Sequence, residues 1–392
     1  MIETKLFKDF FNSEKAGGLI LITCTILSLI IANSNFGAGY HHFWQTQFVG
    51  HSIEYWINDG LMTIFFLLIG LELEREIYKG ELSNIKNALL PIFGAVGGII
   101  VPAGLFMLFN FGTSTQSGAG IPMATDIAFA LGILALLGSR VPTSLKVFLT
   151  ALAVIDDLGA IIIIAIFYTK TIFWTNLSIA LGIFIALLIF NRLKIKNLLP
   201  YLLGGIAMWY FMLNSGVHAT ITGVLLAFAI PFGNGDEKST SYILQHFLHK
   251  PVAFIILPIF ALANTAIALS GDIGQVLTQH YSLGIALGLI VGKPVGISLF
   301  LFLAVTVGFC KLPGDLNWKS IIGVGFLGGI GFTMSIFITL LAFEDETIIN
   351  NAKFVILISS LIAGMVGFIS LKLTLKKARV DNQKLSATAL TS

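Results

Sequence analysis

The chain has 392 residues, of which 56% are hydrophobic and 11% charged, with a formal net charge of +3. Because a typical soluble domain has roughly 25% charged residues, this composition excludes an ordinary soluble domain and indicates a membrane protein. The small net charge gives no reason to expect a nucleic-acid partner. Cys24 and Cys310 match no metal-binding or redox spacing, so no cofactor is expected.

Long apolar runs recur from end to end, each near the ~20 residues that cross about 30 Å of hydrocarbon. Lipid leaves only helices or closed barrels, and barrels show weak alternation instead of long apolar runs, so the runs are predicted to be helices. They cover 12–32, 59–78, 88–109, 120–138, 143–168, 177–193, 198–213, 217–232, 251–269, 281–309, 320–343 and 353–374. We therefore predict an all-α polytopic membrane protein, one domain over 1–392, with about 12 transmembrane helices in the lipid bilayer.

The basic residues are distributed unevenly between the two sides of the predicted helices. All but three of the 23 Lys and Arg residues fall on one side, and the exceptions are Lys170 and Lys353 on the other side and Lys293 inside a span. Because short cytoplasmic loops are enriched in Lys and Arg, the basic side is predicted to be cytoplasmic. Both termini then lie in the cytoplasm, and 375–392 forms a cytoplasmic tail.

Two spans, the fourth and the eleventh, contain residues that loosen a helix. They read "GAGIPMATDIAFALGILALLG" (118–138) and "GVGFLGGIGFTMSIFITLLAF" (323–343). The fourth span runs inward and the eleventh outward, so spans 3–5 (88–168) and 10–12 (281–375) are predicted to be inverted repeats that form the core. Interrupted helices at matching positions of two halves indicate a transporter's midplane site.

A helix that breaks inside the membrane exposes unpaired N–H groups at one end and C=O groups at the other. Two broken helices that cross antiparallel bring like ends together, so each pair of ends needs a counter-charge. The sequence offers Asp126 in the fourth span's break and Lys293 in the tenth span. Close helix packing is the alternative explanation for the glycines.

The stretch "TALAVIDDLGAIIIIAIF" (150–167) places Asp156 and Asp157 in an apolar span. Neighbours on a helix point about 100° apart, so one carboxylate can face a cation cavity while the other pairs with Lys293. A buried carboxylate without a counter-charge holds a proton or a metal cation, but not both. Alternate exposure of such a site exchanges cation for proton. The oxygens of Thr125 and of backbone carbonyls favour a small hard cation.

Five motifs carry a resemblance to the NhaA family of bacterial sodium/proton antiporters. They are "ATDIAFALG" (124–132), "ALAVIDDLGAIIIIA" (151–165), "SGVHATITGVL" (215–225), "GKPVGIS" (292–298) and "GFTMSIFI" (331–338). The similarity runs from about residue 12 to 375. It implies a secondary active antiporter of the cell inner membrane, working by alternating access, and not an enzyme.

The resemblance also implies roles for individual residues. Asp157 corresponds to the essential Na⁺-binding aspartate, Asp156 to its neighbour that also binds lysine, and Lys293 to that lysine. Asp126 and Thr125 correspond to the pair at the crossing of the broken helices. The family's exchange is electrogenic, with two H⁺ per Na⁺, and Li⁺ is accepted.

A pH response is implied for the cytoplasmic cluster "GLELEREIYKG" (70–80), with Glu72, Arg75, Glu76 and also His218 as candidates. The alternatives are a solvated, salt-bridged helix end for the cluster and a packing role for the histidine. Family members form homodimers partly through an outer hairpin between the first two spans. The segment 40–59 looks short for that hairpin, which leaves the homodimer open.

Two other functions use similar features. An intramembrane aspartyl protease needs two membrane carboxylates on facing helices, typically in a GxGD motif, and that motif is absent from the sequence. A channel would conduct far faster than a carrier. Neighbouring aspartates and paired breaks favour the antiporter.

Overall fold

The computed structural model describes residues 5–375 apart from 170 and 269–272, with side chains from residue 16 onward. Lys170 and the predicted tail after residue 375 lie outside the described residues. Nearly all of the described secondary structure is helical, which confirms the predicted all-α class.

The first part of the chain contains two helical spans separated by a short outer hairpin. Its elements are α1 (Lys5–Ala32), α2 (Gly37–Gln45), β1 (Gln47–Phe48), β2 (His51–Ser52), α3 (Ile53–Trp56), the π-helical turn η1 (Ile57–Leu61), α4 (Met62–Tyr78) and the 3₁₀ turn η2 (Glu81–Ser83). The predicted first repeat contains α5 (Ile85–Asn110), the 3₁₀ segment η3 (Gln116–Met123), α6 (Ile127–Leu136), the 3₁₀ turn η4 (Gly138–Arg140) and α7 (Thr143–Phe167).

The second part of the chain starts with the helices between the two predicted repeats. These are α8 (Trp174–Arg192), α9 (Leu199–Leu213), α10 (Ile221–Ala229), α11 (Thr240–Pro251), the π-helical turn η5 (Val252–Ile256), α12 (Leu257–Asn264) and α13 (Ile273–Thr278). The predicted second repeat follows with α14 (His280–Leu287), the π-helical turn η6 (Gly288–Gly292), α15 (Lys293–Val307), α16 (Trp318–Gly328), α17 (Phe332–Ala342) and α18 (Glu346–Thr374).

Each of the twelve predicted runs contains at least one helix. Among the described residues, eight helical segments are long and apolar enough to cross a membrane, and ten if each bent pair is one span. The bent pairs are Ala16–Ala32 with Gly37–Gln45, at 114°, and Trp318–Gly328 with Phe332–Ala342, at 46°. Helices α9 and α10 have 15 and nine residues, which is shorter than the ~20 that span hydrocarbon. The number of crossings therefore stays a prediction.

Some boundaries differ from the predicted ones. The second span begins at Ile53 instead of residue 59, and the ninth begins at Thr240 instead of residue 251. In both cases the added residues mix polar and aromatic side chains with a few aliphatic ones, so a hydropathy pattern does not reveal that the helix continues through them. Both spans, and the tenth, also contain a π-helical turn.

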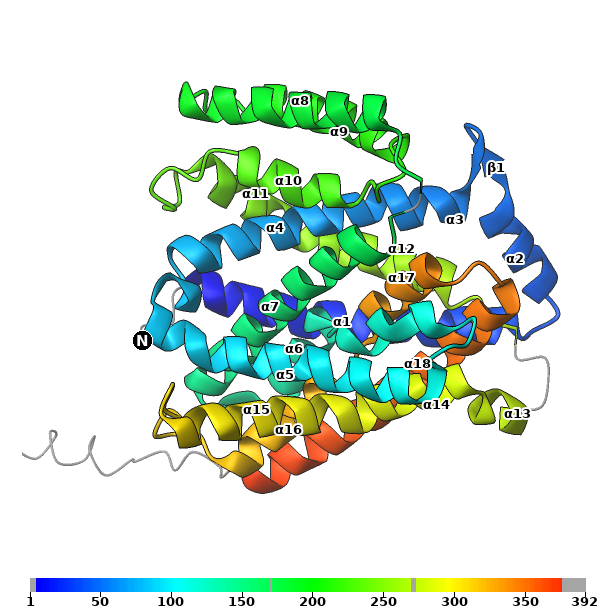
Figure 1. Cartoon of the computed structure of the whole chain (residues 1–392), viewed down its shortest axis with the longest axis vertical. Coiled ribbons are helices and arrows are strands. Elements are labelled where there is room, and N and C mark those ends of the chain that lie inside the picture. Colours follow the sequence, from blue (N-terminus) through cyan, green and yellow to red (C-terminus); the bar gives the residue numbers. More distant parts are fainter. Residues whose placement is uncertain (1–4, 170, 269–272, 376–392) are drawn as a thin grey trace, which may run out of the picture.

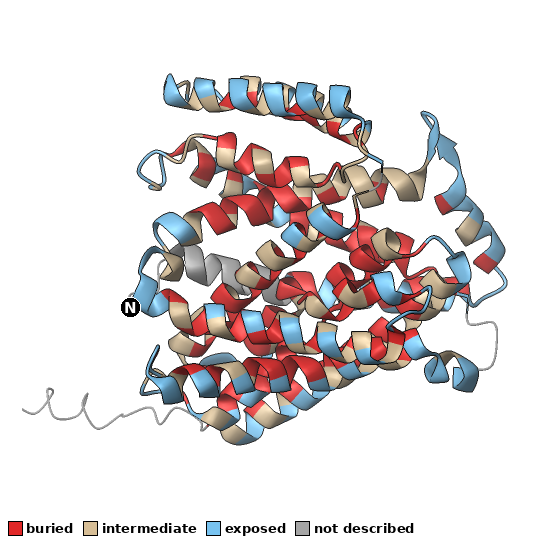
Figure 2. Cartoon of the chain, viewed as in Figure 1, coloured by how far each residue is buried: buried red, intermediate tan, exposed pale blue. Residues whose placement is uncertain are grey.

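The long helices run alongside one another in Figure 1, with α8 and α9 along one edge and α2 with the hairpin at one end. Figure 2 shows that buried residues gather in the middle of this bundle. In the fourth span, Gln116–Leu136, 72% of an apolar stretch of 18 residues is buried inside the structure, against 11% of such a stretch in α8. The interrupted fourth span is therefore central, whereas α8 presents most of its surface outward.

Close backbone contact between α5 and α15 fixes the position of Lys293. A Cβ atom added to Gly97 of α5 would lie 2.2 Å from the carbonyl oxygen of Gly296, and one added to Gly296 would lie 2.2 Å from that of Gly97. Only glycine fits at both positions. Lys293 is the first residue of α15 and lies one turn before Gly296. The contact therefore sets the depth within the bundle at which the Lys293 side chain leaves the backbone.

The outer hairpin consists of two short strands. β1 pairs with β2 antiparallel, with Gln47 opposite Ser52 and Phe48 opposite His51. The turn residues Val49 and Gly50 have φ angles of 48° and 83°, the left-handed conformation that a two-residue hairpin turn requires. This conformation is unusual for a β-branched residue. The described segment is thus a hairpin, and whether it joins two protomers stays a prediction.

Candidate functional site

The two interruptions meet inside the bundle. The backbone N–H of Asp126, in the break between η3 and α6, donates to the carbonyl oxygen of Ile330, in the break between α16 and α17, at 2.7 Å. A Cβ atom added to Gly329 would lie 2.2 Å from the carbonyl oxygen of Leu289 in η6. The second break therefore needs glycine because it lies directly against the π-helical turn that precedes Lys293.

One carboxylate accepts hydrogen bonds from the N-terminal ends of both broken helices. Asp126 is the N-cap of α6, and its Oδ1 accepts from the N–H of Phe129 at 3.0 Å. Its Oδ2 accepts from the N–H of Thr333 in the first turn of α17 at 3.1 Å and from the Thr333 hydroxyl at 2.5 Å. A negative side chain at two helix N-termini is electrostatically favourable. The geometry matches the expected counter-charge for the positive ends.

Asp156, on α7, has a cationic partner. Its Oδ2 accepts from Lys293 Nζ at 2.5 Å and lies 2.7 Å from the hydroxyl of Thr125. The same hydroxyl lies 2.7 Å from the carbonyl oxygen of Gly328 at the C-terminal end of α16. Since a hydroxyl has one proton, Thr125 donates to one of these acceptors at a time. The side chains of Asp156 and Lys293 are both 0% exposed.

Asp157 has different surroundings from its neighbour. It is 0% exposed, and neither of its carboxylate oxygens has a hydrogen-bond partner among the described residues. The Oδ1 of Asp156 likewise has none. An unpaired buried carboxylate is very costly, so Asp157 requires a proton, a cation or water to be stable. The lysine neutralises Asp156 and leaves Asp157 as the group whose charge must be balanced from outside the chain.

The described residues contain no group of three or more His, Cys, Asp or Glu side chains that could hold a metal ion. The available donors are instead carboxylate, hydroxyl and carbonyl oxygens, which suit weakly held hard cations. Such a site can bind a small cation reversibly and release it on protonation. These properties suit a transported ion better than a resident metal.

The candidate residues of the pH response lie in the part of α4 next to its end, and Glu72 is close enough to Asp157 for its charge to act on that carboxylate. Glu72, Arg75 and Glu76 are half-buried in the last two turns of α4. Glu76 Oε2 accepts from the N–H of Glu81 at 3.0 Å, and the Arg75 guanidinium carbon lies 5.0 Å from the ring centroid of Tyr242 on α11. The cluster is thus tied to η2 and α11, and a role in regulation stays a prediction.

His218 is not close to that cluster in the structure. Its Nε2 lies 2.8 Å from the carbonyl oxygen of Tyr168, the C-cap residue that follows α7. Tyr168 in turn donates its hydroxyl proton to the carbonyl oxygen of Ser117 at 2.7 Å. This end of α7 is the one predicted to face outside, whereas the end of α4 is predicted to face the cytoplasm. A local structural role is consistent with these contacts.

Sequence reasoning missed three hydroxyl residues around the breaks. Thr333 bonds to Asp126, Ser335 donates to the carbonyl oxygen of Ile121 at 2.6 Å, and Ser360 of α18 accepts from the N–H of Phe332 at 3.1 Å. A signal was present, because Thr333 follows the second break much as Thr125 lies in the first. The partners could not be identified without the crossing geometry.

These features define a polytopic helical membrane protein with a charged centre where two interrupted helices meet, which is the architecture of a secondary transporter. The family model described as Na⁺/H⁺ antiporter 1 matches residues 8–371. The chain therefore belongs to this family, known as NhaA, whose members are transporters and not enzymes, and the resemblance is confirmed.

Proteins from several bacteria are similar to this chain over nearly their whole length. The Na(+)/H(+) antiporter NhaA of Flavobacterium psychrophilum is 76% identical, covering 97% of this chain and 99% of that protein. The Na(+)/H(+) antiporter NhaA of Cytophaga hutchinsonii is 63% identical, covering 95% and 97%. That of Dechloromonas aromatica is 62% identical, covering 93% and 95%.

Proposed function

We propose that this chain exchanges Na⁺ for H⁺ across the bacterial inner membrane, with the cation and protons competing for Asp156 and Asp157. The observation that carries the proposal is the difference between the two carboxylates. Asp156 has Lys293 at 2.5 Å, whereas Asp157 is fully buried without a partner among the described residues. The relatives' names, Na(+)/H(+) antiporter NhaA, support the same exchange.

The chemistry follows from charge balance at this centre. When Na⁺ neutralises Asp157, a proton is not needed there, and when a proton binds, the cation is released. If the site changes sides only when it holds either Na⁺ or protons, and never when it is empty, the two fluxes are coupled. Asp126 does not take part directly in this scheme, because both of its oxygens already accept hydrogen bonds from the two broken helices.

We further propose an electrogenic stoichiometry of two H⁺ per Na⁺, with Li⁺ also accepted. Two neighbouring carboxylates can each release a proton when the cation binds, provided that Lys293 has first separated from Asp156 and a proton has taken its place on that carboxylate. Li⁺ and Na⁺ are both small hard cations that carboxylate and hydroxyl oxygens bind. K⁺ is expected to be transported poorly because it is larger.

For the alternating exposure of the site, we propose that the repeats 88–168 and 281–375 move as the core against the remaining helices, with both termini in the cytoplasm. The meeting of the two breaks is consistent with a fixed site between two repeats. A pH response at Glu72, Arg75, Glu76 or His218 and assembly into a homodimer belong to the same proposal.

The test uses the purified full chain in proteoliposomes that contain a pH-sensitive dye. Na⁺, Li⁺ and K⁺ are added in turn, and the expected result is proton movement with Na⁺ and Li⁺ and little with K⁺. At zero membrane potential, the two-to-one stoichiometry predicts that net flux stops when the Na⁺ ratio equals the square of the H⁺ ratio. A balance point at equal ratios would contradict electrogenic exchange, and no proton movement would contradict antiport.

A further inference from the structure

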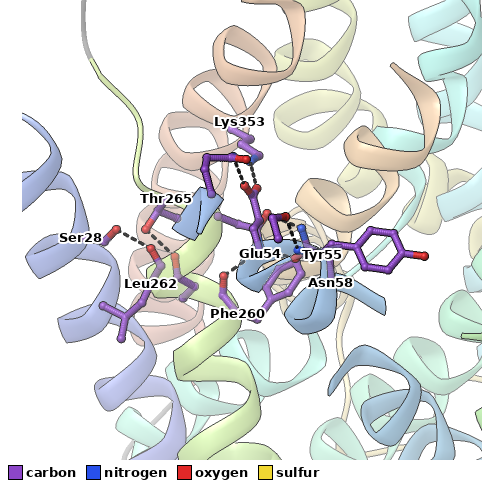
Figure 3. A network of polar contacts seen from close by, with 12 residues as sticks. Ser28, Glu54, Tyr55, Asn58, Phe260, Leu262, Thr265 and Lys353 are labelled. Atoms are coloured by element: carbon purple, nitrogen blue, oxygen red, sulfur yellow. Dashed lines mark hydrogen bonds and ion pairs between the residues drawn. The ribbon is translucent and has the colours of Figure 1, made fainter. Parts of the chain in front are cut away.

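The structure contains a second polar network, at the end of the bundle predicted to face outside, as Figure 3 shows. It connects helices that lie outside the two predicted repeats. Ser28 of α1 and Tyr40 of α2 both donate to the carbonyl oxygen of Leu262 of α12, at 2.8 and 2.9 Å. Asn58 of η1 and Asn264 of α12 exchange amide hydrogen bonds, at 2.6 and 3.4 Å. We call these helices, α1, α2, α3 with η1, and α12, the outer frame.

One ion pair connects the outer frame to the predicted second repeat. Glu54 of α3 has Oε2 accepting from Gln45 of α2 at 2.8 Å and Oε1 at 3.7 Å from Lys353 Nζ of α18. In Figure 3 the Lys353 and Glu54 side chains point toward each other from their two helices. Their side chains are 6% and 20% exposed. Glu54 thus belongs to the outer frame, and Lys353 contacts it from α18 of the predicted second repeat.

Lys353 is exceptional for its position in the chain. It lies on the side predicted to face outside, where the sequence has almost no basic residues. The enrichment of Lys and Arg in cytoplasmic loops therefore does not explain why a lysine is present here. It is also buried, at 4% exposure, where a lysine without a partner would be strongly destabilising. A specific requirement for an ion pair at this position explains both facts.

The helix that carries Lys353 is bound to the transport centre. Two turns after Lys353, Ser360 accepts from the N–H of Phe332, the first residue of α17 after the break. Near the start of α18, Asn351 donates to the hydroxyl of Tyr281 on α14 at 3.1 Å. A displacement of α18 relative to the frame is therefore transmitted to the break between α16 and α17, next to which Thr333 donates to Asp126.

We propose that Glu54 and Lys353 form an outer latch, an ion pair that closes the outer side of the transporter and separates when the cation site opens outward. The inference rests on the proposed exchange and on its alternating access. The neutral hydrogen bonds within the frame are mostly short and directional, whereas the latch is a longer ionic contact. When it opens at the membrane edge, water hydrates both charges, so the cost of separation is much smaller than for a pair at the midplane.

The test compares variants of the full chain in proteoliposomes and in oriented vesicles. Glu54→Gln and the neutral pair Glu54→Gln with Lys353→Met remove the latch, and the exchange Glu54→Lys with Lys353→Glu reverses it. The first readout is the apparent KM for Na⁺ measured separately from the outer and the inner face. Removal should lower the outer-to-inner KM ratio by about threefold to tenfold, and the reversed pair should bring the ratio back toward that of the parent.

The second readout does not depend on transport. In a background where Cys24 and Cys310 are replaced by Ala, Thr265→Cys places a thiol at the buried C-cap of α12, near the latch. Removing the latch should raise its labelling rate by a membrane-impermeant maleimide, added from outside, by about threefold to tenfold. The matched control is Lys372→Met, which removes an exposed lysine from the opposite end of α18 and should change neither readout.

The results of these experiments distinguish failure of the latch proposal from failure of the proposed Na⁺/H⁺ exchange. A parent that moves no protons on Na⁺ addition contradicts the proposed function, and the labelling rates then still decide whether the pair closes the outer side. An active parent with unchanged KM ratio and unchanged labelling in the neutral pair overturns the latch. A lower melting temperature in these variants, without either change, shows that the ion pair only stabilises the fold and equally refutes it.

Discussion

Asp156 and Asp157 are neighbours in the sequence, yet their surroundings make them chemically different. Asp156 accepts from Lys293 and lies within hydrogen-bond distance of Thr125, while Asp157 has no hydrogen-bond partner among the described side chains or backbone. The helical rotation of about 100° between neighbours directs only one of them at the lysine. Residue order alone could predict only that one carboxylate would be paired; the family resemblance implied Asp156, and in the structure Lys293 does donate to Asp156.

Replacing Asp157 by asparagine should abolish exchange while the protein remains folded. An amide can neither release a proton at physiological pH nor neutralise a cation. The measurement is Na⁺-dependent proton flux in proteoliposomes, with the melting temperature as the check on folding and the exposed Asp236→Asn as the control. Retained Na⁺-dependent flux in Asp157→Asn would exclude this residue as the binding carboxylate. Thr125→Val should only slow exchange, because Asp156 keeps Lys293 as a partner.

Lys293→Ala should destabilise the protein more than it weakens Na⁺ binding. Removing the lysine leaves Asp156 buried without its cation, a change that costs roughly 3–5 kcal/mol when one partner of a buried pair is lost. Thermal unfolding and Na⁺ binding by calorimetry give the two quantities, and the exposed Lys372→Ala on α18 serves as the control. A variant as stable as the parent but unable to bind Na⁺ would instead make the lysine part of the binding site.

At the scale of secondary structure, the interrupted helices depend on a single carboxylate between them. Asp126 accepts from Phe129 on α6 and from Thr333 on α17, so two helix N-termini share one counter-charge. The glycine-rich sequences predicted the interruptions and their need for a negative charge. The contribution of Thr333 could not be predicted, because it depends on the angle and depth at which the two spans cross.

Thr333→Val tests this bridge against a matched position on the same helix. The variant keeps the backbone N–H bond to Asp126 but loses the hydroxyl bond, and hydrogen bonds to charged groups contribute roughly 1.5–3 kcal/mol. Thr339, also buried on α17, donates instead to the carbonyl of Ser335 in its own helix at 2.8 Å. Thr333→Val should therefore lower the melting temperature more than Thr339→Val does. Equal effects of the two variants would mean that the hydroxyl does not stabilise the crossing.

At the scale of the whole molecule, the transport centre and the candidate pH cluster belong to different elements, with Glu72 the member of the cluster whose charge acts on Asp157. The centre lies where the two breaks meet, whereas Glu72, Arg75 and Glu76 are in the last turns of α4. Competition between Na⁺ and H⁺ at the centre and a conformational switch at the cluster would both make transport depend on pH. They differ in whether a high Na⁺ concentration can restore the rate.

We expect competition to dominate the pH dependence. Protons that occupy Asp156 and Asp157 at lower pH raise the apparent KM for Na⁺, while the rate at saturating Na⁺ stays nearly constant. A separate sensor would add a conformational equilibrium that Na⁺ could not overcome at acidic pH. The measurement is the initial rate against pH at limiting and at saturating Na⁺. If the two profiles coincide, the cytoplasmic cluster and not competition controls the response.

The variant Glu76→Gln completes this comparison. We expect it to shift the pH profile modestly without abolishing transport, because Glu76 contacts the backbone of Glu81 and not the transport centre. Glu237→Gln, an exposed carboxylate between α10 and α11, is the control and should leave the profile unchanged. A profile that is identical in Glu76→Gln and in the parent would remove Glu76 from the regulatory proposal.

Much of the architecture could be predicted because hydropathy and charge patterns depend only on residues that are close together in the sequence. The apolar runs, the two interruptions and the intramembrane charges follow from residue order alone, and each predicted run does contain a helix. The ion pair of Glu54 with Lys353 joins residues 299 positions apart, and no local pattern relates them. The early starts of the spans at Ile53 and Thr240 follow the N-caps Ser52 and Ser239, whose side chains accept from the N–H groups of Tyr55 and Tyr242.

The π-helical turn η6 has a consequence for how the gene can change. Such a turn holds one residue more than an α-helical turn and absorbs a single inserted residue within a helix. A deletion of one codon within Gly288–Gly292 would let the α-helix continue and would leave Lys293 facing nearly the same way relative to Tyr281, because the wider turn already absorbs the extra residue. A deletion of one codon between Tyr281 and the turn would instead rotate the lysine by about 100° away from Asp156, although every residue of the charged centre would still be encoded. The turn is therefore a place where this span can lose a residue without losing the direction of its lysine.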